Sequence, residues 1–336
     1  MDSVSQIALG AAVGVAVMGR RTAVWKAALW GGLCGTLPDL DSFIDHGDPV
    51  SNMTLHRAHS HALFWLTLVS PAIAWLAARL NGEPQLFKRW WLALWLALVT
   101  HPLLDLMTVY GTQLARPFTD RPFALGSIFI IDPLYALPLL GGVVAALSRR
   151  EGRGLAWNRA GLLLSTAYLG WSVAAQQHVT QLASASLAAE GIAVQALLVT
   201  PTPFNTVLWR IVAVTPDGHL EGFRSLLDRG PQVRFDRFDR GRALHDALAG
   251  HAPVGRIAWF SRGFFKLSQQ GEQVLISDLR MGQEPHYSFS FVVARWRGDA
   301  LHPVSPPSSA GSRGDIAAML EWLSRRARGE PLAPPR

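Results

Sequence analysis

Residues 91–107 read WLALWLALVTHPLLDLM, and this stretch decides how the first half of the chain is interpreted. Almost every position is apolar, and the length approaches the roughly 20 residues that a helix needs to cross a bilayer. Similar segments lie at 62–80, 127–147 and 155–174, and two shorter ones lie at 7–18 and 23–37. The sequence therefore predicts an α-helical integral membrane bundle of about six helical segments.

Composition separates this half from the rest of the chain. Of the 336 residues 49% are hydrophobic and 16% are charged, whereas a typical soluble domain has roughly 25% charged residues. Charges are sparse up to Ala175 and evenly spread after Thr200. We therefore expect a helical membrane domain at 1–175, a helical linker at 176–193 and a soluble domain at 194–336.

The distribution of basic residues gives a predicted orientation. Loops after the first, third and fifth segments carry ten basic residues, Arg150 among them, against three after the second and fourth. Cytoplasmic loops carry the excess of Lys and Arg, so the first set is placed in the cytoplasm. The loop at 38–61 and the C-terminal half then lie on the outer side. The net charge of +7 is explained by these loops, and no nucleic-acid partner is expected.

The second half has the pattern of a mainly β domain. Segments rich in Val, Ile, Phe and Trp lie at 194–200, 206–215, 220–227, 255–268, 273–281 and 287–296. Turn signals between them favour antiparallel hairpins. A helix is expected at 315–328, after a link rich in Pro, Ser and Gly at 303–314.

Ionisable residues stand at the ends of three apolar segments. They are Asp39 with Asp41, His56 with His61, and His101 with Asp105, the last pair on one helix face at i, i+4. The predicted topology brings all three places to one level, and charges at membrane depth are expensive and usually functional. We therefore predict a metal site with the ligands Asp39, Asp41, His56, His61, His101 and Asp105. A donor set without thiolate favours zinc, manganese or iron and does not choose among them.

Other residues at this level have more than one interpretation. Asp2 and Gln6 open the first segment, and His59 lies between two predicted ligands. Asp132 precedes Pro133, so it either joins the site or caps a helix. Taken singly, the acids could be solvated loop residues, the His101–Asp105 pair could be structural, and the histidines could be interface residues.

Several motifs resemble a known family. The stretches LPDLD at 37–41, His56-Arg57 with Ser60-His61, and THPLLD at 100–105 resemble signatures of the YbcI/YdjM-type membrane-bound metal-dependent hydrolases. The opening residues 2–6, DSVSQ, followed by Gly10, resemble the start of that family. Gln6 stands where many members have His, and His59 departs from the usual apolar or aromatic residue. The resemblance covers roughly residues 1–175.

The resemblance implies a bacterial inner (cytoplasmic) membrane protein, a divalent metal with zinc preferred, and a hydrolase distantly similar to zinc-dependent phospholipase C. The expected substrate has a phosphoester or related bond in a lipid or envelope molecule, and membrane lipids are the expected partners. A metal lowers the pKa of its bound water towards ~7. Asp39 or Asp41 could accept the proton, and Arg57 could contact a phosphate or pair with an aspartate.

Two other functions stay open. The first is a non-catalytic membrane protein with a structural metal site that displays its β domain to binding partners. The second is a transporter or ion pathway, which is disfavoured because the acids lie at helix ends rather than mid-span.

Overall fold

The computed structural model describes residues 1–149 and 152–336, so Arg150 of the predicted basic loops lies outside the described residues. Contacts divide the chain into two compact units. The first, here the helical unit, comprises Met1–Ile44, Arg57–Val173 and Pro203–Asn205. The second, here the β unit, comprises Asp45–His56, Ala174–Thr202 and Thr206–Arg336.

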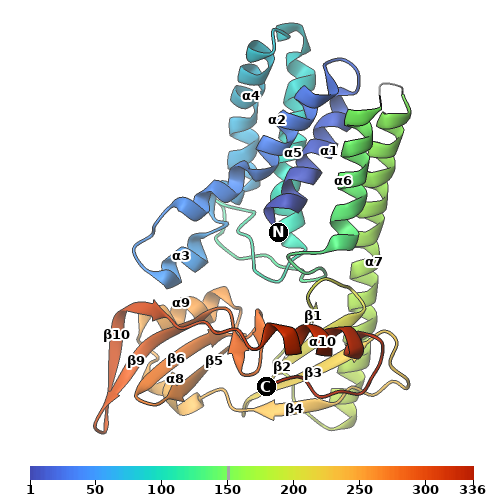
Figure 1. Ribbon diagram of the computed structural model, residues 1–336. Helices are drawn as coiled ribbons and strands as arrows, with labels where there is room; N and C mark the ends of the chain where they lie inside the picture. Colours follow the sequence, from blue (N-terminus) through green and yellow to red (C-terminus); the bar gives the residue numbers. More distant parts are fainter. Residues whose placement is uncertain (150–151) are drawn as a thin grey trace. The chain divides into compact units, whose positions relative to one another are not determined.

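The helical unit consists of packed helices with three short 3-10 helices between some of them, and an irregular segment at 107–132 joins α5 to α6 (Figure 1). The helices are α1 (Ser3–Met18), α2 (Val24–Thr36), α4 (Leu63–Leu80), α5 (Phe87–Leu106), α6 (Pro133–Ser148) and the first part of α7 (Arg153–Ala189). The 3-10 helices are η1 (Leu37–Phe43), η2 (His59–His61) and η3 (Pro84–Leu86). Large side chains of α5, among them Trp90, Leu94 and Leu98, are fully buried against small residues of α1 and α2. This packing holds α5 in the centre of the unit.

Glycines bring α1 and α2 into backbone contact. A methyl group on Gly10 or Gly31 would overlap the carbonyl oxygen of the other residue. A methyl group on Gly35 would likewise overlap the carbonyl oxygen of Gln6. Small residues spaced four apart allow such close helix approach in membrane proteins. The contact places the end of α2 beside the start of α1, where two of the predicted site segments begin.

The prediction of a six-helix integral membrane bundle is wrong. Among the described residues, α4 is the one helix long and apolar enough to cross a membrane. Helices α1 and α6 have 16 residues each and α2 has 13, so they measure about 20–24 Å, against about 30 Å of hydrocarbon. Helix α5 has 20 residues, but ionisable side chains occupy both of its ends. The protein instead has a helical N-terminal region with one candidate span, followed by a β-sheet region.

The β unit contains two four-stranded antiparallel sheets (Figure 1). The first has the order β1-β2-β3-β4, with strands β1 (Ala196–Pro201), β2 (Leu208–Val214), β3 (His219–Ser225) and β4 (Phe235–Phe238). The second has the order β10-β9-β6-β5, with strands β5 (Phe265–Gln270), β6 (Gln273–Asp278), β9 (Ser290–Arg297) and β10 (Ala300–Ser309). A small hairpin pairs β7 (Gly282–Gln283) with β8 (His286–Tyr287). The helices of this unit include α3 (Pro49–Leu55), α8 (Arg242–Ala247), α9 (Ala252–Phe260) and α10 (Ile316–Ala327).

Two segments of the β unit differ from their predicted structure. The strand expected at 255–268 is helix α9 followed by β5, because Pro253 starts a helix and Gly263, at φ +86°, lies in the left-handed turn after it. The link expected at 303–314 contains most of β10. Its prolines are tolerated because β10 is an edge strand, which needs hydrogen bonds on one side only.

The β unit takes two pieces from outside the C-terminal half. Helix α7 continues to Ala189, and its buried Val179 and Ala183 pack against Trp209 of β2. Helix α3 packs against α9, and Arg256 Nε of α9 donates a hydrogen bond to Thr54 Oγ1 of α3. The segment between η1 and η2 in the chain therefore belongs to the β unit.

Candidate metal centre

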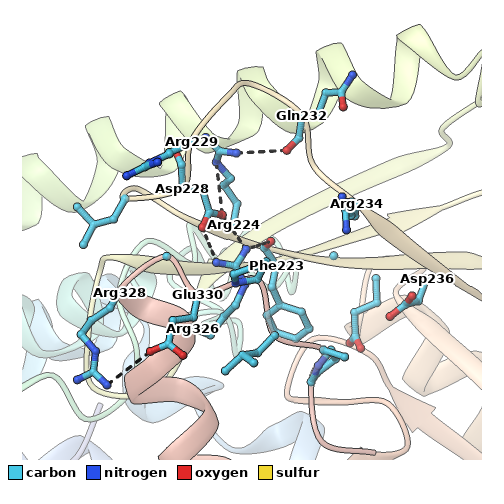
Figure 2. A pocket seen from close by; sticks show the side chains of 18 residues that line it. Phe223, Arg224, Asp228, Arg229, Gln232, Arg234, Asp236, Arg326, Arg328 and Glu330 are labelled. Carbon is cyan, nitrogen blue, oxygen red and sulfur yellow. Dashed lines mark hydrogen bonds and ion pairs between the residues drawn. The ribbon is translucent and has the colours of Figure 1, made fainter.

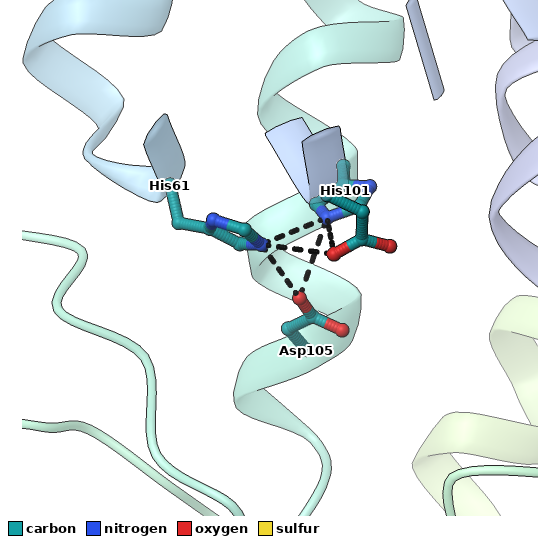
Figure 3. Close-up of side chains that lie close together, drawn as sticks. His61, His101 and Asp105 are labelled. Carbon is teal, nitrogen blue, oxygen red and sulfur yellow. Dashed lines mark hydrogen bonds and ion pairs between the residues drawn. The ribbon is translucent and has the colours of Figure 1, made fainter. Parts of the chain in front are cut away.

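Four side chains of the helical unit form a group that could hold a metal ion. They are Asp39 of η1, His61 of η2, and His101 and Asp105 of α5. One donor atom from each lies within 4.8 Å of every other. Figure 3 shows His61, His101 and Asp105 pointing toward one another. Of the six predicted ligands, the structure brings these four together.

The nitrogen–nitrogen and nitrogen–oxygen separations between the donor atoms are nearly equal. Nε2 of His61 lies 3.1 Å from Nε2 of His101, and each lies 3.3–3.4 Å from Asp39 Oδ1 and Asp105 Oδ2. With the two oxygens at most 4.8 Å apart, the point equidistant from all four atoms lies about 2.0–2.4 Å from each. Zinc binds nitrogen and oxygen at about 2.0–2.2 Å. The spacing therefore fits a bound divalent metal ion.

The hydrogen bonding of the two carboxylates also favours a bound metal ion. Asp39 Oδ1 and Asp105 Oδ2 are buried, and neither makes a well-aligned hydrogen bond with a described residue. Buried carboxylate oxygens without donors cost free energy unless something else compensates their charge. A cation among the four atoms would supply that compensation, so the residues present fit a bound divalent metal.

Each histidine is fixed through its other ring nitrogen. His101 Nδ1 donates to the carbonyl oxygen of Gly35 at 2.6 Å. His61 Nδ1 lies 2.9 Å from Ser60 Oγ, which itself donates to Asp41 Oδ2. An Nδ1 that donates leaves Nε2 as a lone-pair donor facing the centre. Asp41 therefore orients His61 from behind and is not one of the four converging residues.

Asp105 is supported on its other side by the start of α1. Gln6 Nε2 donates to Asp105 Oδ1 and to the carbonyl oxygen of His101, both at 3.2 Å. The Met1 amino group also donates to Asp105 Oδ1. These contacts turn Oδ2 of Asp105 toward the centre. Gln6, at the position where the resembled family often has His, contacts a ligand and is not itself one of the four.

Arg57 connects several parts of the site. Its backbone is in the left-handed region, at φ +63°. Non-glycine residues are uncommon in this region, and those that adopt it cluster at functional sites. Its backbone N–H donates to Asp41 Oδ2 at 3.0 Å, and its Nε lies 3.4 Å from Asp105 Oδ2. The buried guanidinium also donates to Thr108 Oγ1 and lies over the Tyr110 ring. Arg57 thus contacts carboxylates on both sides of the site.

The titration of the group follows from its charges. Burial alone would raise the pKa of Asp39, but the imidazoles of His101 and His61, which lie 3.3–3.4 Å from its Oδ1, hold that pKa well below its usual range. Burial alone would lower the pKa of His61, but the carboxylates of Asp105 and Asp39 raise that pKa to about 9. Without a metal, the group therefore retains a proton, and a metal must displace it.

The other predicted residues lie elsewhere. His56 ends α3 and belongs to the β unit. His59 is exposed and hydrogen-bonded to Arg116. Asp2 caps α1, and Asp132 caps α6 while accepting from Tyr168.

Several contributors were not predicted as site residues, among them Gly35, Ser60 and the Met1 amino group. The carbonyl of Gly35 leaves no side-chain signal in the sequence. Ser60 was visible only as the neighbour of His61.

Fold and site together define a class: a helical region with one candidate membrane span that carries a buried donor set of two histidines and two aspartates. The family described as YdjM inner membrane protein matches residues 1–179, a range that includes all four donors. The chain belongs to this family, and the resemblance seen in its motifs is confirmed.

One curated relative is also similar. Uncharacterized protein YfhP of Bacillus subtilis (strain 168) is 32% identical over 154 residues. The match covers 43% of this chain and 45% of that protein, so it spans less than half of either. No solved structure matches this chain significantly.

Proposed function

We propose that this membrane protein is a metal-dependent hydrolase, with zinc as its metal and a phosphoester or related bond in a lipid or envelope molecule as its substrate. The observation that carries the proposal is the convergence of four nearly equidistant donor atoms, two of them buried oxygens without donors. A donor set of imidazole and carboxylate without thiolate is common in catalytic zinc sites, whereas structural sites are usually rich in cysteine. The only cysteine of the chain, Cys34, is not part of the group.

The roles of the residues follow from their contacts. A bound divalent metal would supply a Lewis acid and lower the pKa of water at the site. Asp39 is the proton acceptor in this proposal, because its side chain is 21% exposed while those of the other three donors are 0% exposed. Asp41 is a positioning residue, since its carboxylate is occupied by Ser60 and the backbone of Arg57.

Arg57 acts mainly by positioning Asp105. Its side chain is 7% exposed and lies against Asp105 and Thr108. A guanidinium held in this way compensates part of the negative charge of Asp105. Contact between Arg57 and a substrate phosphate stays a prediction, which a Lys substitution tests, because Lys keeps the charge and loses the planar geometry.

A structural metal site is the second candidate. One observation favours it: four protein donors can complete a tetrahedral site and leave no position for water. In that case the helical unit would be an anchor, and the β unit would carry the binding function. Metal content alone does not separate the two candidates, so activity has to be measured as well.

The experiment combines both measurements on the purified full chain. Bound metal is determined by mass spectrometry, and hydrolysis is followed with bis-p-nitrophenyl phosphate and a short-chain phospholipid. We expect bound zinc and metal-dependent hydrolysis that Asp39→Asn abolishes and Asp45→Asn, in an exposed loop, leaves intact. Bound metal without hydrolysis of either compound would support the structural site. Absence of metal would overturn both candidates.

We further propose that the site lies at the outer face of the inner membrane. Basic residues near α4 support this, because Arg79, Lys88 and Arg89 lie at or beyond its C-terminal end, away from His61. The test introduces Phe43→Cys, at a position 85% exposed, in a Cys34→Ser background. Labelling of intact cells by an impermeant reagent is expected, and labelling only after lysis would reverse the orientation.

A further inference from the structure

The β unit contains a pocket that the metal centre does not explain. It lies between the loop at 226–234, strand β3 and the segment at 328–334 (Figure 2). Its volume is about 850 Å³, within the range of pockets that bind small molecules. Ten charged or polar side chains and several apolar ones line it. The charges decide which ligand fits.

The acidic side chains of the pocket are already neutralised. Each of the four carboxylates forms an ion pair at 2.5–3.0 Å with an arginine: Glu221 with Arg210 and Arg336, Asp228 with Arg326, Asp236 with Arg336, and Glu330 with Arg325. A paired carboxylate attracts a second cation weakly, because the arginine cancels most of its field. The acids therefore do not make this a cation site.

Three arginines of the pocket remain available to contact an anionic ligand. Arg229 and Arg234 are exposed and form no hydrogen bond or ion pair with any residue that the structure describes. Arg328 is exposed, and its contact with Glu330 is long, at 3.9 Å. Figure 2 shows these three side chains around the pocket. The surplus charge of the lining is therefore positive.

The walls that carry these arginines are held in place. Buried Arg224 donates to three carbonyl oxygens of the loop, those of Asp228, Gly230 and Gln232. Arg326 of α10 binds Asp228 through two parallel contacts of 2.5 and 2.6 Å. Burial alone would raise the pKa of Asp228, but this pair with Arg326 lowers it, so the contact persists well below neutral pH. A preformed pocket loses less entropy when a ligand binds.

Apolar surface lies next to the arginines. Leu227 is 62% exposed, and Phe223, Pro331 and Leu332 also line the pocket. A large exposed leucine beside exposed arginines is suited to a ligand with both an anionic and an apolar part. Arginine is well matched to phosphate because its planar group can donate two parallel hydrogen bonds.

We propose that this pocket binds a phosphate-bearing anion, with Arg229, Arg234 and Arg328 contacting the phosphate and Leu227 contacting an adjoining apolar group. The phosphate could belong to an anionic lipid headgroup or to a free phosphate compound. This proposal is independent of the hydrolase proposal, since it uses no residue of the metal centre.

The test is calorimetric titration of the purified full chain in a neutral detergent. The probes are dihexanoyl phosphatidylglycerol, inorganic phosphate and an acidic peptide without phosphate. We expect the phosphate probes to bind, and Arg229→Glu with Arg234→Glu to weaken binding roughly 10-fold or more, because two charge-assisted contacts are lost. Arg295→Glu, an exposed arginine of β9, is the matched control and should bind as the parent does.

The results distinguish the two possible sources of the phosphate. Tighter binding of phosphatidylglycerol than of inorganic phosphate indicates a lipid headgroup, and equal binding indicates free phosphate. Binding of neither probe, equal binding by the double variant, or binding of the acidic peptide alone would overturn the proposal. The single variant Arg234→Gln, which removes charge without reversing it, checks that any loss is not caused by misfolding.

Discussion

Two buried groups in this protein combine histidine with carboxylate, one in each unit. In the helical unit the group consists of Asp39, His61, His101 and Asp105. In the β unit Glu284 lies against His219 at 3.2 Å and accepts two hydrogen bonds from Lys266 Nζ at 2.6 and 2.7 Å. The two groups look similar in composition and differ in how donors and acceptors are balanced.

The Glu284 group satisfies its charge internally. Its carboxylate receives an ammonium group and the Tyr287 hydroxyl, which donates at 3.1 Å. The metal group has two carboxylates facing two imidazoles, and two of its oxygens have no well-aligned donor. The convergence of four nitrogen and oxygen atoms, two of them carboxylate oxygens without a well-aligned hydrogen bond, therefore distinguishes the candidate metal centre from the Glu284 group.

The largest expected effect is a loss of bound metal, and it tests directly the difference between the two groups. His101→Ala removes one of four donors, so we expect bound metal to be lost, with a decrease in affinity of roughly 100-fold or more, beyond the effect of an outer contact. His219→Ala removes the histidine of the other group and should leave the metal content unchanged. Mass spectrometry of the purified variants measures both. Equal loss in the two variants would mean that the comparison is mistaken.

A smaller effect on metal affinity is expected when the hydrogen-bonded residues that orient His61 are changed. Asp41→Asn weakens the chain from Asp41 through Ser60 to His61 and should lower metal affinity about 10–100-fold without abolishing binding. Competition with a fluorescent zinc chelator gives the affinity. Asp48→Asn, which alters the N-cap of α3 and not the contacts from Asp41 to His61, is the matched change. Complete loss of metal in Asp41→Asn would make Asp41 a ligand, and no change would remove its positioning role.

The smallest effect concerns stability in the β unit. Burial alone would raise the pKa of Glu284, but hydrogen bonds from His219 and Lys266 lower it from 4.5 to about 2. Its stabilisation is therefore fully present above about pH 4.5 and is lost as the pH falls towards 2. Glu284→Gln should cost about 1–3 kcal/mol in the free energy of unfolding at pH 7.

Urea unfolding in detergent, followed by tryptophan fluorescence, measures this difference. The gap between the parent chain and Glu284→Gln should narrow at pH 3. The same gap at both pH values would show that ionised Glu284 is not what stabilises the unit.

Four of the six predicted ligands lie together in the structure, whereas the predicted six-helix membrane topology is wrong. His101 and Asp105 lie one helical turn apart, so their common face follows from local geometry. Asp39 and His61 were identified because both adjoin apolar helices. His56 could not be separated from them, since its place in the β unit depends on the packing of α3 against α9, residues far apart in the chain. Helix α6 is shorter than the apolar stretch predicted at 127–147, because Asp132 caps it and it begins only at Pro133.

The packing of α3 against α9 determines where this protein can be divided into parts. A truncation ending near residue 175 would keep α3 and remove α9, leaving the face that α9 covers without its partner. Because α3 lies in the chain between Asp41 and Arg57, its loss of order would reach the loops that present two of the donors. The two halves are therefore poor candidates for separate expression, and any exchange of the β unit between relatives should carry residues 45–56 with it.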